Sequence, residues 1–204
     1  GHSEAIHLRK RIRGSQRHLL GIITDLRNYS GLEAGQVTYD MHSVSVRAVV
    51  ETVVPLLEPQ AASKNIALGY APCAPELIMR ADRTKVEQII LNLLLNATQA
   101  IPDCDVAGNH IRICTSTASS GRAVTTVSDT GAGIPAEVMG RIFDPFFTTQ
   151  PVGVGTGLGL FICHGIVRAL GGEIVAESVV AEGTTFRVIL PPSRPEKSAG
   201  RTAG

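Results

Sequence analysis

Three amide side chains recur at helical spacing in DRTKVEQIILNLLLNATQA, residues 82–100. Asn92, Asn96 and Gln99 stand at positions i, i+4 and i+7, which lie on one face of a helix. Asparagine is a poor choice for a helix interior unless its amide has a role. Either this face is simply exposed to solvent, or Asn96 gives its carbonyl oxygen to a hard cation such as Mg²⁺, which prefers oxygen ligands and usually also binds substrate phosphates.

A carboxylate and two glycines follow one another in SDTGAGIP, residues 128–135. Asp129, at the end of a strand-like run, could accept a hydrogen bond from an exocyclic amine, while Gly131 and Gly133 let the backbone approach a flat ring. An ordinary Asp–Gly turn is the plain alternative. The string DTGA also resembles the signature of aspartic proteases, whose two Asp residues share a proton. That signature needs an all-β surrounding, and at least three well-patterned helices in this chain argue against a protease.

Glycines occupy alternate positions in FDPFFTTQPVGVGTGLGLFI, residues 143–162, at Gly153, Gly155, Gly157 and Gly159. They permit unusual backbone angles and leave N–H groups uncovered where a helix begins, which indicates an anion site with a mobile cover. Glycine-rich turns without ligands are also frequent. No lysine follows, so GxxxxGK[ST] is not matched, and any phosphates would be held by backbone amides and a metal ion.

Hydrophobic periodicity indicates the helices and strands on which these residues lie. Asp82 is a plausible N-cap for a helix over 82–101, whose apolar stripe is Val86, Ile89, Ile90, Leu93, Leu94 and Ala97. A second helix is predicted over 157–172 and a third over 46–65, where prolines 55 and 59 should bend or shorten it. Predicted strands cover 66–71 and 76–81, then a strand pair over 109–118 and 123–129 and a closing hairpin over 173–178 and 184–191.

The N-terminal segment carries a heptad seam. Its positions are Leu8, Ile12, Ser15, Leu19, Ile22, Leu26 and Tyr29. The other faces are rich in arginine, which is typical of a solvated coiled-coil or bundle helix more often than of a nucleic-acid arm. A lone helix would leave this apolar seam exposed to solvent, so the helix should pair with a second copy or another chain. The first three residues resemble an expression remnant, and a domain boundary is expected near 36–44.

Composition narrows the function classes. The chain has 204 residues, 44% hydrophobic and 18% charged, with a net charge of +1, so nothing in its charge favours nucleic acid or an anionic membrane. Its longest apolar runs fall well short of the ~20 residues that span a bilayer. The four cysteines show neither paired nor metal-ligand spacing, which favours free thiols in a reducing compartment. We therefore expect a cytoplasmic protein.

Taken in order, these segments resemble the ATP-binding catalytic domain of sensor histidine kinases, in the superfamily shared with DNA gyrase, Hsp90 and MutL. Residues 82–100 resemble its N box, SDTGAGIP its G1 box, RIFDPFFTT its F box, GTGLGL its G2 box and EGTTF its closing hairpin. The similarity runs from about residue 5 to 191. Four boxes in order make the resemblance specific.

The resemblance implies an α/β (α+β) two-layer sandwich, with a mixed sheet packed on three helices and preceded by one long helix. It divides the chain into a partial dimerisation region (1–36, second helix of the hairpin only), an ATP-binding catalytic domain (44–193) and a disordered tail (194–204). It also implies that ATP lies between the N-box helix and the lid, with Mg²⁺ on Asn96. The implied ATP-site residues are Asn92, Asn96, Gln99, Asp129, Gly131, Gly133, Ile134, Phe147, Gly155, Gly157, Leu158, Gly159, Leu160 and Thr184.

Within that set the resemblance gives several residues a role. Asn92 would lie near the phosphates, and Asp129 would receive the adenine amine. Gly133 and Ile134 would flank the base, and Thr184 would approach it through its hydroxyl. The stretch from Gly157 to Leu160 would line the triphosphate side.

Two departures from the family matter. Gln150, Gln99 and Ala100 stand where many relatives carry lysine, a basic residue and an aromatic residue, so phosphate affinity should be lower. Neither His7 nor His18 has the sequence context of the phosphoacceptor, which lies on the first helix of the hairpin, so no catalytic residue is identified. We expect this chain to bind ATP without phosphorylating itself.

In the full-length protein the γ-phosphoryl group would pass to a histidine outside this chain and then to a response regulator. That protein should be a homodimer, and neither nucleic acid nor direct membrane contact is expected of this part. The alternative is a non-kinase ATP-dependent clamp of the Hsp90 or MutL type.

Overall fold

The computed structural model describes residues 23–24, 26–31, 34–35, 37–72, 76–103, 108–150 and 155–193. Most of the heptad segment, with His7 and His18, lies outside the described residues, as does the predicted tail. Residues 26–31 are helical and belong to the predicted N-terminal helix. The division of the chain into three regions stays a prediction.

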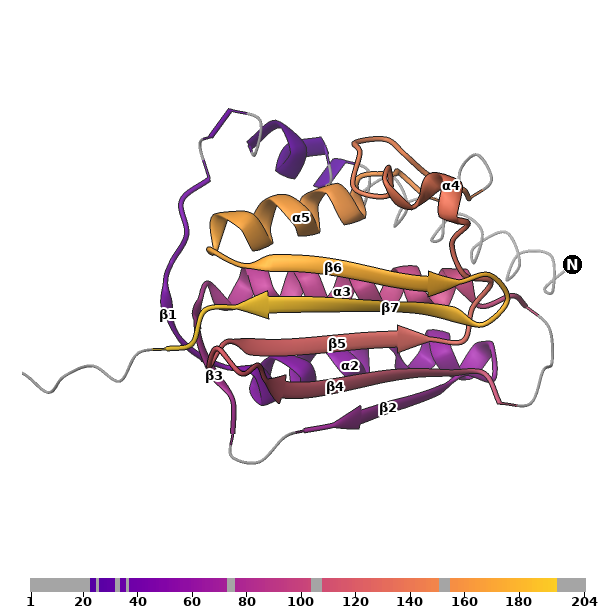
Figure 1. The fold of residues 1–204 in the computed structure, drawn as a ribbon, viewed down its shortest axis with the longest axis horizontal. Coiled ribbons are helices and arrows are strands. Elements are labelled where there is room, and N and C mark those ends of the chain that lie inside the picture. Colours follow the sequence, from indigo (N-terminus) through magenta and orange to yellow (C-terminus); the bar gives the residue numbers. More distant parts are fainter. Residues whose placement is uncertain are drawn as a thin grey trace, which may run out of the picture.

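Five strands form one mixed sheet in the spatial order β2–β4–β5–β7–β6 (Figure 1). They span Ala67–Ala71 (β2), His110–Thr117 (β4), Ala123–Asp129 (β5), Glu173–Val179 (β6) and Gly183–Leu190 (β7). β2 runs parallel to β4, and all other neighbours are antiparallel. The predicted strand pair and closing hairpin are both present, and the parallel β2 makes the sheet mixed.

Helices α2 (Val46–Ser63), α3 (Arg83–Ala100) and α5 (Gly159–Ala169) form the second layer (Figure 1). In β4, Ile111 and Ile113 are buried and Arg112 between them is exposed, the alternation of a sheet with one covered face. The buried side chains of sheet and helices form one continuous core. The predicted two-layer sandwich is therefore confirmed. Within the described parts of the chain, no helix combines the length and apolar character needed to cross a membrane.

Helix α2 continues through both of its prolines, so the expectation that they shorten it is wrong. Its start is capped by Ser45, whose Oγ accepts the N–H of Ala48 at 3.1 Å. Pro55 and Pro59 are both exposed and lie one turn apart on the solvent side. The carbonyls that lose their intrahelical donors there can bond to water, which lowers the part of the cost of an internal proline that comes from the lost hydrogen bonds.

Helix α3 is secured at both ends by side chains. Asp82 is its N-cap, as predicted, and its Oδ1 accepts the N–H of Lys85 at 3.2 Å while Oδ2 accepts the N–H of Asp40 at 3.0 Å. At the other end, the ammonium of Lys64 donates to the carbonyls of Thr98 and Ile101 at 2.9 and 2.6 Å. These contacts satisfy backbone groups that a helix leaves unpaired at its ends.

Two short elements were not predicted from the sequence. Strand β1 (His42–Ser45) pairs antiparallel with β3 (Ile78–Ala81) in a separate two-stranded sheet, and α4 (Ala136–Met139) is a single helical turn. Elements of four residues carry too few side chains for a periodic signal. β1 fixes the point where the chain from the N-terminal helix enters the sandwich.

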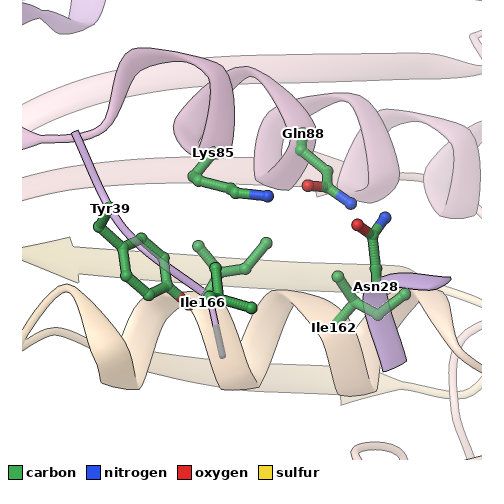
Figure 2. Close-up of a pocket in the computed structure, with 7 residues that line it drawn as sticks. Asn28, Tyr39, Lys85, Gln88, Ile162 and Ile166 are labelled. Atoms are coloured by element: carbon green, nitrogen blue, oxygen red, sulfur yellow. The ribbon is translucent and has the colours of Figure 1, made fainter. Parts of the chain in front are cut away.

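A small cavity of about 10 Å³ marks where this entering chain lies against α3 and α5. Figure 2 shows Lys85 and Gln88 on α3, Ile162 and Ile166 on α5, and Tyr39 on the entering chain around it. This volume holds at most about one water molecule. The cavity is therefore a packing gap and no place for a ligand.

Replacing Asp82 by alanine should lower the free energy of unfolding by about 1–2 kcal/mol, because the N–H groups of Lys85 and Asp40 lose their shared acceptor. Burial of the carboxyl opposes its ionisation, but hydrogen bonds from the Thr84 hydroxyl and from backbone N–H groups outweigh burial and lower the pKa of Asp82. The stabilisation is therefore complete above the ordinary carboxyl pKa and is lost as pH falls through the lowered one. Urea unfolding followed by circular dichroism from neutral to acidic pH measures the difference.

The matched control is Asp144→Ala, which removes an exposed carboxylate 3.6 Å from Arg141 and should change stability little. An equal loss in both variants, or a loss in Asp82→Ala that persists unchanged at acidic pH, would contradict the capping role.

Candidate functional site

One large cavity, of about 810 Å³, lies along the second half of α3. Opposite α3 it is walled by the segment 147–150, the start of α5 and the loop that follows β5. Its volume falls within the range of pockets that bury small molecules, roughly 300–1,000 Å³. It is the candidate functional site.

The cavity brings together most of the residues that the sequence singled out. These are Asn92, Asn96, Gln99, Asp129, Gly133, Ile134, Phe147, Gly155, Gly157, Gly159, Leu160 and Thr184. The amide face of α3 is half-buried and lines the cavity, so it is not a plain solvent-exposed face.

Gly131 and Leu158 are not brought to the cavity wall. Gly131 faces the end of α3, where a Cβ would lie 2.7 Å from the carbonyl carbon and oxygen of Ala100. Leu158 is buried in the core, and its N–H donates to Oγ1 of Thr156 at 3.2 Å. Both residues lie in close packing next to the wall, and their predicted contact with a ligand stays a prediction.

Several lining residues were not predicted. Thr148 and Thr149 follow Phe147 in the F-box segment, and Thr156 stands between two predicted glycines; Gln150, noted in the sequence as standing where relatives carry lysine, also lines the cavity. Gln60 comes from the last turn of α2, outside every motif. Only the packing of α2 against α3 brings it to the cavity, and no local pattern in the sequence could have indicated it.

The loop after β5 is held on two sides by backbone contacts. The N–H of Ala132 donates to the carbonyl of Ala100 at 2.9 Å, and the N–H of Ala181 donates to the carbonyl of Ala132 at 2.9 Å. Gly133 has φ +72°, and a Cβ there would lie 2.2 Å from the carbonyl oxygen of Val179. The loop is thus fixed between the end of α3 and the β6–β7 turn.

Asp129 is the buried carboxylate of this loop, with 8% of its surface exposed. Burial raises the pKa of Asp129, although N–H groups of Gly131 and Thr184 bond to the carboxylate and oppose the shift. The Gly131 N–H lies 2.8 Å from Oδ1. We call this part of the cavity, Asp129 to Ile134 with Thr184, the loop end.

The start of α5 forms the opposite part of the cavity, which we call the helix end (residues 155–160). Gly157 has φ +68°, and a Cβ there would lie 2.5 Å from the carbonyl carbon of Phe146, so only glycine fits this approach. α5 begins without a side-chain cap. Its first N–H groups and its dipole therefore remain available to an anion.

Contacts along α3 set the distance between the two ends. The loop end meets α3 at Ala100, whereas Nδ2 of Asn92 lies 3.4 Å from the carbonyl of Gly159 at the helix end. Eight residues of helix separate these contacts, which is about 12 Å at ~1.5 Å per residue. The cavity therefore suits an elongated ligand.

The charge of the cavity is unusual for an anion site. Among the described residues that line it, Asp129 is the only charged one. The guanidinium of Arg141 lies 4.8 Å from the ring centroid of the lining residue Phe147, but Arg141 itself does not line the cavity. No group of three or more His, Cys, Asp or Glu residues suited to a metal ion occurs in the described parts of the chain. Any cation held here would rest mainly on amide oxygens and on the ligand itself.

Known proteins match both sequence and fold. Residues 81–194 match the family of histidine kinase-, DNA gyrase B- and HSP90-like ATPases. Sensor kinase CckA of Brucella abortus is 41% identical over 134 residues, covering 59% of this chain and 14% of CckA. The chain spans less than a third of the length of such curated relatives.

Solved structures agree. The catalytic domain of histidine kinase ThkA is 30% identical with a TM-score of 0.66, covering 75% of this chain and 96% of that domain. Full-length ShkA in complex with AMPPNP is 27% identical with a TM-score of 0.79, covering 91% of this chain and 38% of ShkA. ThkA in complex with the response regulator protein TrrA is 27% identical with a TM-score of 0.70, covering 91% of this chain and 50% of that chain. The chain therefore belongs to the histidine kinase-, DNA gyrase B- and HSP90-like ATPase family and contains a sensor histidine kinase catalytic domain.

Proposed function

We propose that this chain binds ATP in the large cavity and, within its parent protein, supplies the γ-phosphoryl group to a histidine outside these 204 residues. The observation that carries the proposal is the pairing of a buried carboxylate at the loop end with an uncapped helix start at the helix end of one cavity. A base with an exocyclic amine fits the carboxylate at the loop end, and a chain of phosphates fits the uncapped helix start at the helix end.

The loop end is suited to adenine. An ionised carboxylate only accepts hydrogen bonds, so Asp129 selects a ligand edge that donates, as an exocyclic amine does. Gly133 and Ile134 border the same space, and close backbone packing at Gly133 leaves no room for a side chain there. Backbone hydrogen bonds and close packing hold the loop in place, so binding there should need little rearrangement.

The helix end is suited to phosphates, and Asn96 fits a magnesium ion. Amide oxygen is a ligand that Mg²⁺ accepts, and Mg²⁺ usually keeps several waters and binds substrate phosphates as well. A bound Mg²⁺ would neutralise part of the phosphate charge, which the described lining residues do not do with cationic side chains. Asn92, held against Gly159, would keep α3 and the start of α5 together around the phosphates.

Transfer requires a nucleophile in line with the γ-phosphate, because the protein's contribution to phosphoryl transfer is mainly positioning and electrostatic stabilisation. We assign that nucleophile to a histidine on the first helix of a dimerisation hairpin, outside this chain, and the next acceptor to a response regulator in the cytoplasm. The known complex of ThkA with TrrA supports the second step. The similarity to sensor kinases supports this proposal over the clamp ATPase.

Asp129→Asn should weaken ATP binding by about tenfold to a hundredfold, the range for losing a hydrogen bond to a buried charged acceptor. Because burial raises the pKa of Asp129, the ionised carboxylate costs stability at neutral pH, and this cost disappears as pH falls below the ordinary carboxyl pKa. The variant should therefore be at least as stable as the parent at neutral pH. Isothermal titration calorimetry and thermal unfolding measure the two effects.

ATP affinity should fall as acid protonates Asp129. Because burial raises the pKa of Asp129, this fall should begin at a higher pH than for an ordinary aspartate. Asp144→Asn, which changes an exposed carboxylate outside the cavity, is the control and should retain affinity. Unaltered ATP affinity in Asp129→Asn would remove the adenine assignment.

Asn96→Ala should remove most of the gain in ATP affinity that Mg²⁺ provides, by roughly tenfold, because the cation loses its protein oxygen ligand. Affinity for ATP in the presence of EDTA should change much less. Gln88→Ala removes an amide two turns earlier on the same helix and outside the cavity, and should leave the Mg²⁺ response intact. An equal Mg²⁺ response in Asn96→Ala and the parent would place the ion elsewhere.

With γ-labelled ATP, the 204-residue chain should form no phosphoprotein, whereas a longer protein that adds the first hairpin helix upstream should become labelled. The adduct should be acid-labile and base-stable, as expected of phosphohistidine. The same longer protein with Asn96→Ala serves as the control and should label weakly. Release of free phosphate without labelled protein would favour the clamp ATPase instead.

A further inference from the structure

Ser178, near the end of β6, lies behind the loop end of the cavity and does not line it. Its Oγ makes three contacts, with the N–H of Ile134 at 2.8 Å, the carbonyl oxygen of Gly183 at 2.8 Å and Oγ1 of Thr184 at 2.9 Å. It therefore joins the loop after β5 to the strand that carries Thr184. Any role of Ser178 toward a ligand rests on the proposed function, because it concerns how this cavity chooses its nucleotide.

The direction of these hydrogen bonds is set by the number of hydrogens. A serine hydroxyl has one hydrogen and two lone pairs. The carbonyl of Gly183 can only accept, so the hydrogen of Ser178 is committed to it. The N–H of Ile134 can only donate, so it occupies one lone pair. The second lone pair remains for Thr184, whose hydroxyl must therefore be the donor.

Thr184 is thereby left as an acceptor toward the cavity. Its hydroxyl has one hydrogen, and that hydrogen points to Ser178, so only lone pairs remain for a ligand. Thr184 is 4% exposed and lines the cavity beside Asp129, its partner in the pairing of β5 with β7. The ionised carboxylate also accepts only. The loop end consequently presents two acceptors side by side and no side-chain donor from this pair.

We propose that Ser178 is a positioning residue that fixes Thr184 as a hydrogen-bond acceptor and so sets the preference of the site for a 6-aminopurine over a 6-oxopurine nucleotide. An exocyclic amine brings two N–H donors to this pair of acceptors. The 6-oxygen of a 6-oxopurine is itself an acceptor, and the neighbouring N1–H supplies a single donor, so one of the two acceptors faces the 6-oxygen without a hydrogen to share. Without Ser178, the Thr184 hydroxyl turns and donates, which relieves part of that mismatch.

The test compares ATP with ITP, which differ in the group at the 6-position of the purine and in the hydrogen that N1 carries in ITP. Both dissociation constants are measured by calorimetry with Mg²⁺ for the unaltered chain and for Ser178→Ala. We expect the ITP-to-ATP ratio of dissociation constants to fall by about tenfold in Ser178→Ala, which is the change in affinity that one ordinary hydrogen bond provides. Thr184→Val should lower the ratio as well, and adding Ser178→Ala to it should produce no further change, because the two act as one unit.

Ser128→Ala is the matched control, since Ser128 lies on β5 outside the cavity and its Oγ faces the carbonyl of Arg112. Its ratio should equal that of the unaltered chain. If Ser178→Ala fails to fold, Ser178→Cys replaces it, because a thiol is a weak hydrogen-bonding group of similar shape.

A merely structural role for Ser178 would weaken ATP and ITP equally and leave their ratio unchanged, and that result overturns the proposal. An additive further fall in the double variant overturns it too. If the unaltered chain binds no ATP, the proposed function itself fails. ATP binding by the unaltered chain with a constant ratio in Ser178→Ala overturns only the role of Ser178.

Discussion

The close approach of three backbone segments at the end of β5 is the constraint on which the site depends. The loop after Asp129 passes between the end of α3 and the β6–β7 turn, and glycine is required where the segments touch. A Cβ on Gly183 would lie 1.9 Å from the carbonyl oxygen of Asp129, and one on Gly133 would lie 2.2 Å from that of Val179. Because backbone rather than side chain fills this space, the position of the carboxylate is set by the sheet register itself, with Asp129 opposite Thr184. The loop end is therefore built by the same contacts that hold the sandwich together.

The helix end is organised differently. Its wall consists of the start of α5, the F-box residues and one contact from α3, in which Asn92 reaches Gly159 at 3.4 Å. Hydrogen bonds hold the loop end on both sides, whereas the helix end meets α3 through this longer contact. A ligand that joins the two ends would stabilise the helix end most, because most of the fixed contacts already lie at the loop end. Binding energy gained at a preorganised base site can thus be used to order the phosphate site.

The sequence predicted the elements with strong periodicity and missed those held by tertiary contacts. The stripe on α3 and the hairpin of β6 and β7 each carry enough alternation to be read directly. β1 and α4 have four residues each and carry no comparable signal. Gln60 reaches the cavity only through helix packing, and Ser178 is an ordinary strand serine until its three partners are known. The prediction that the prolines would shorten α2 failed because the cost of an internal proline depends on which face of the helix it occupies.

The electrostatics of the cavity support the proposed need for an acceptor helix outside this chain. Among the described lining residues, the one charge is negative and sits at the loop end, so side chains do not neutralise a triphosphate at the helix end. In the proposed function, backbone amides and a metal ion would hold the phosphates in the ground state, but interactions accelerate transfer only when they strengthen in the transition state. The described lining residues include no cationic side chain that could stabilise the charge that develops as the γ-phosphoryl group departs. In the proposed function, the acceptor imidazole and the helix that carries it would supply this stabilisation, because they would complete the site only in the geometry that permits transfer. A domain that binds nucleotide but lacks this stabilisation on its own would suit control by the position of that helix.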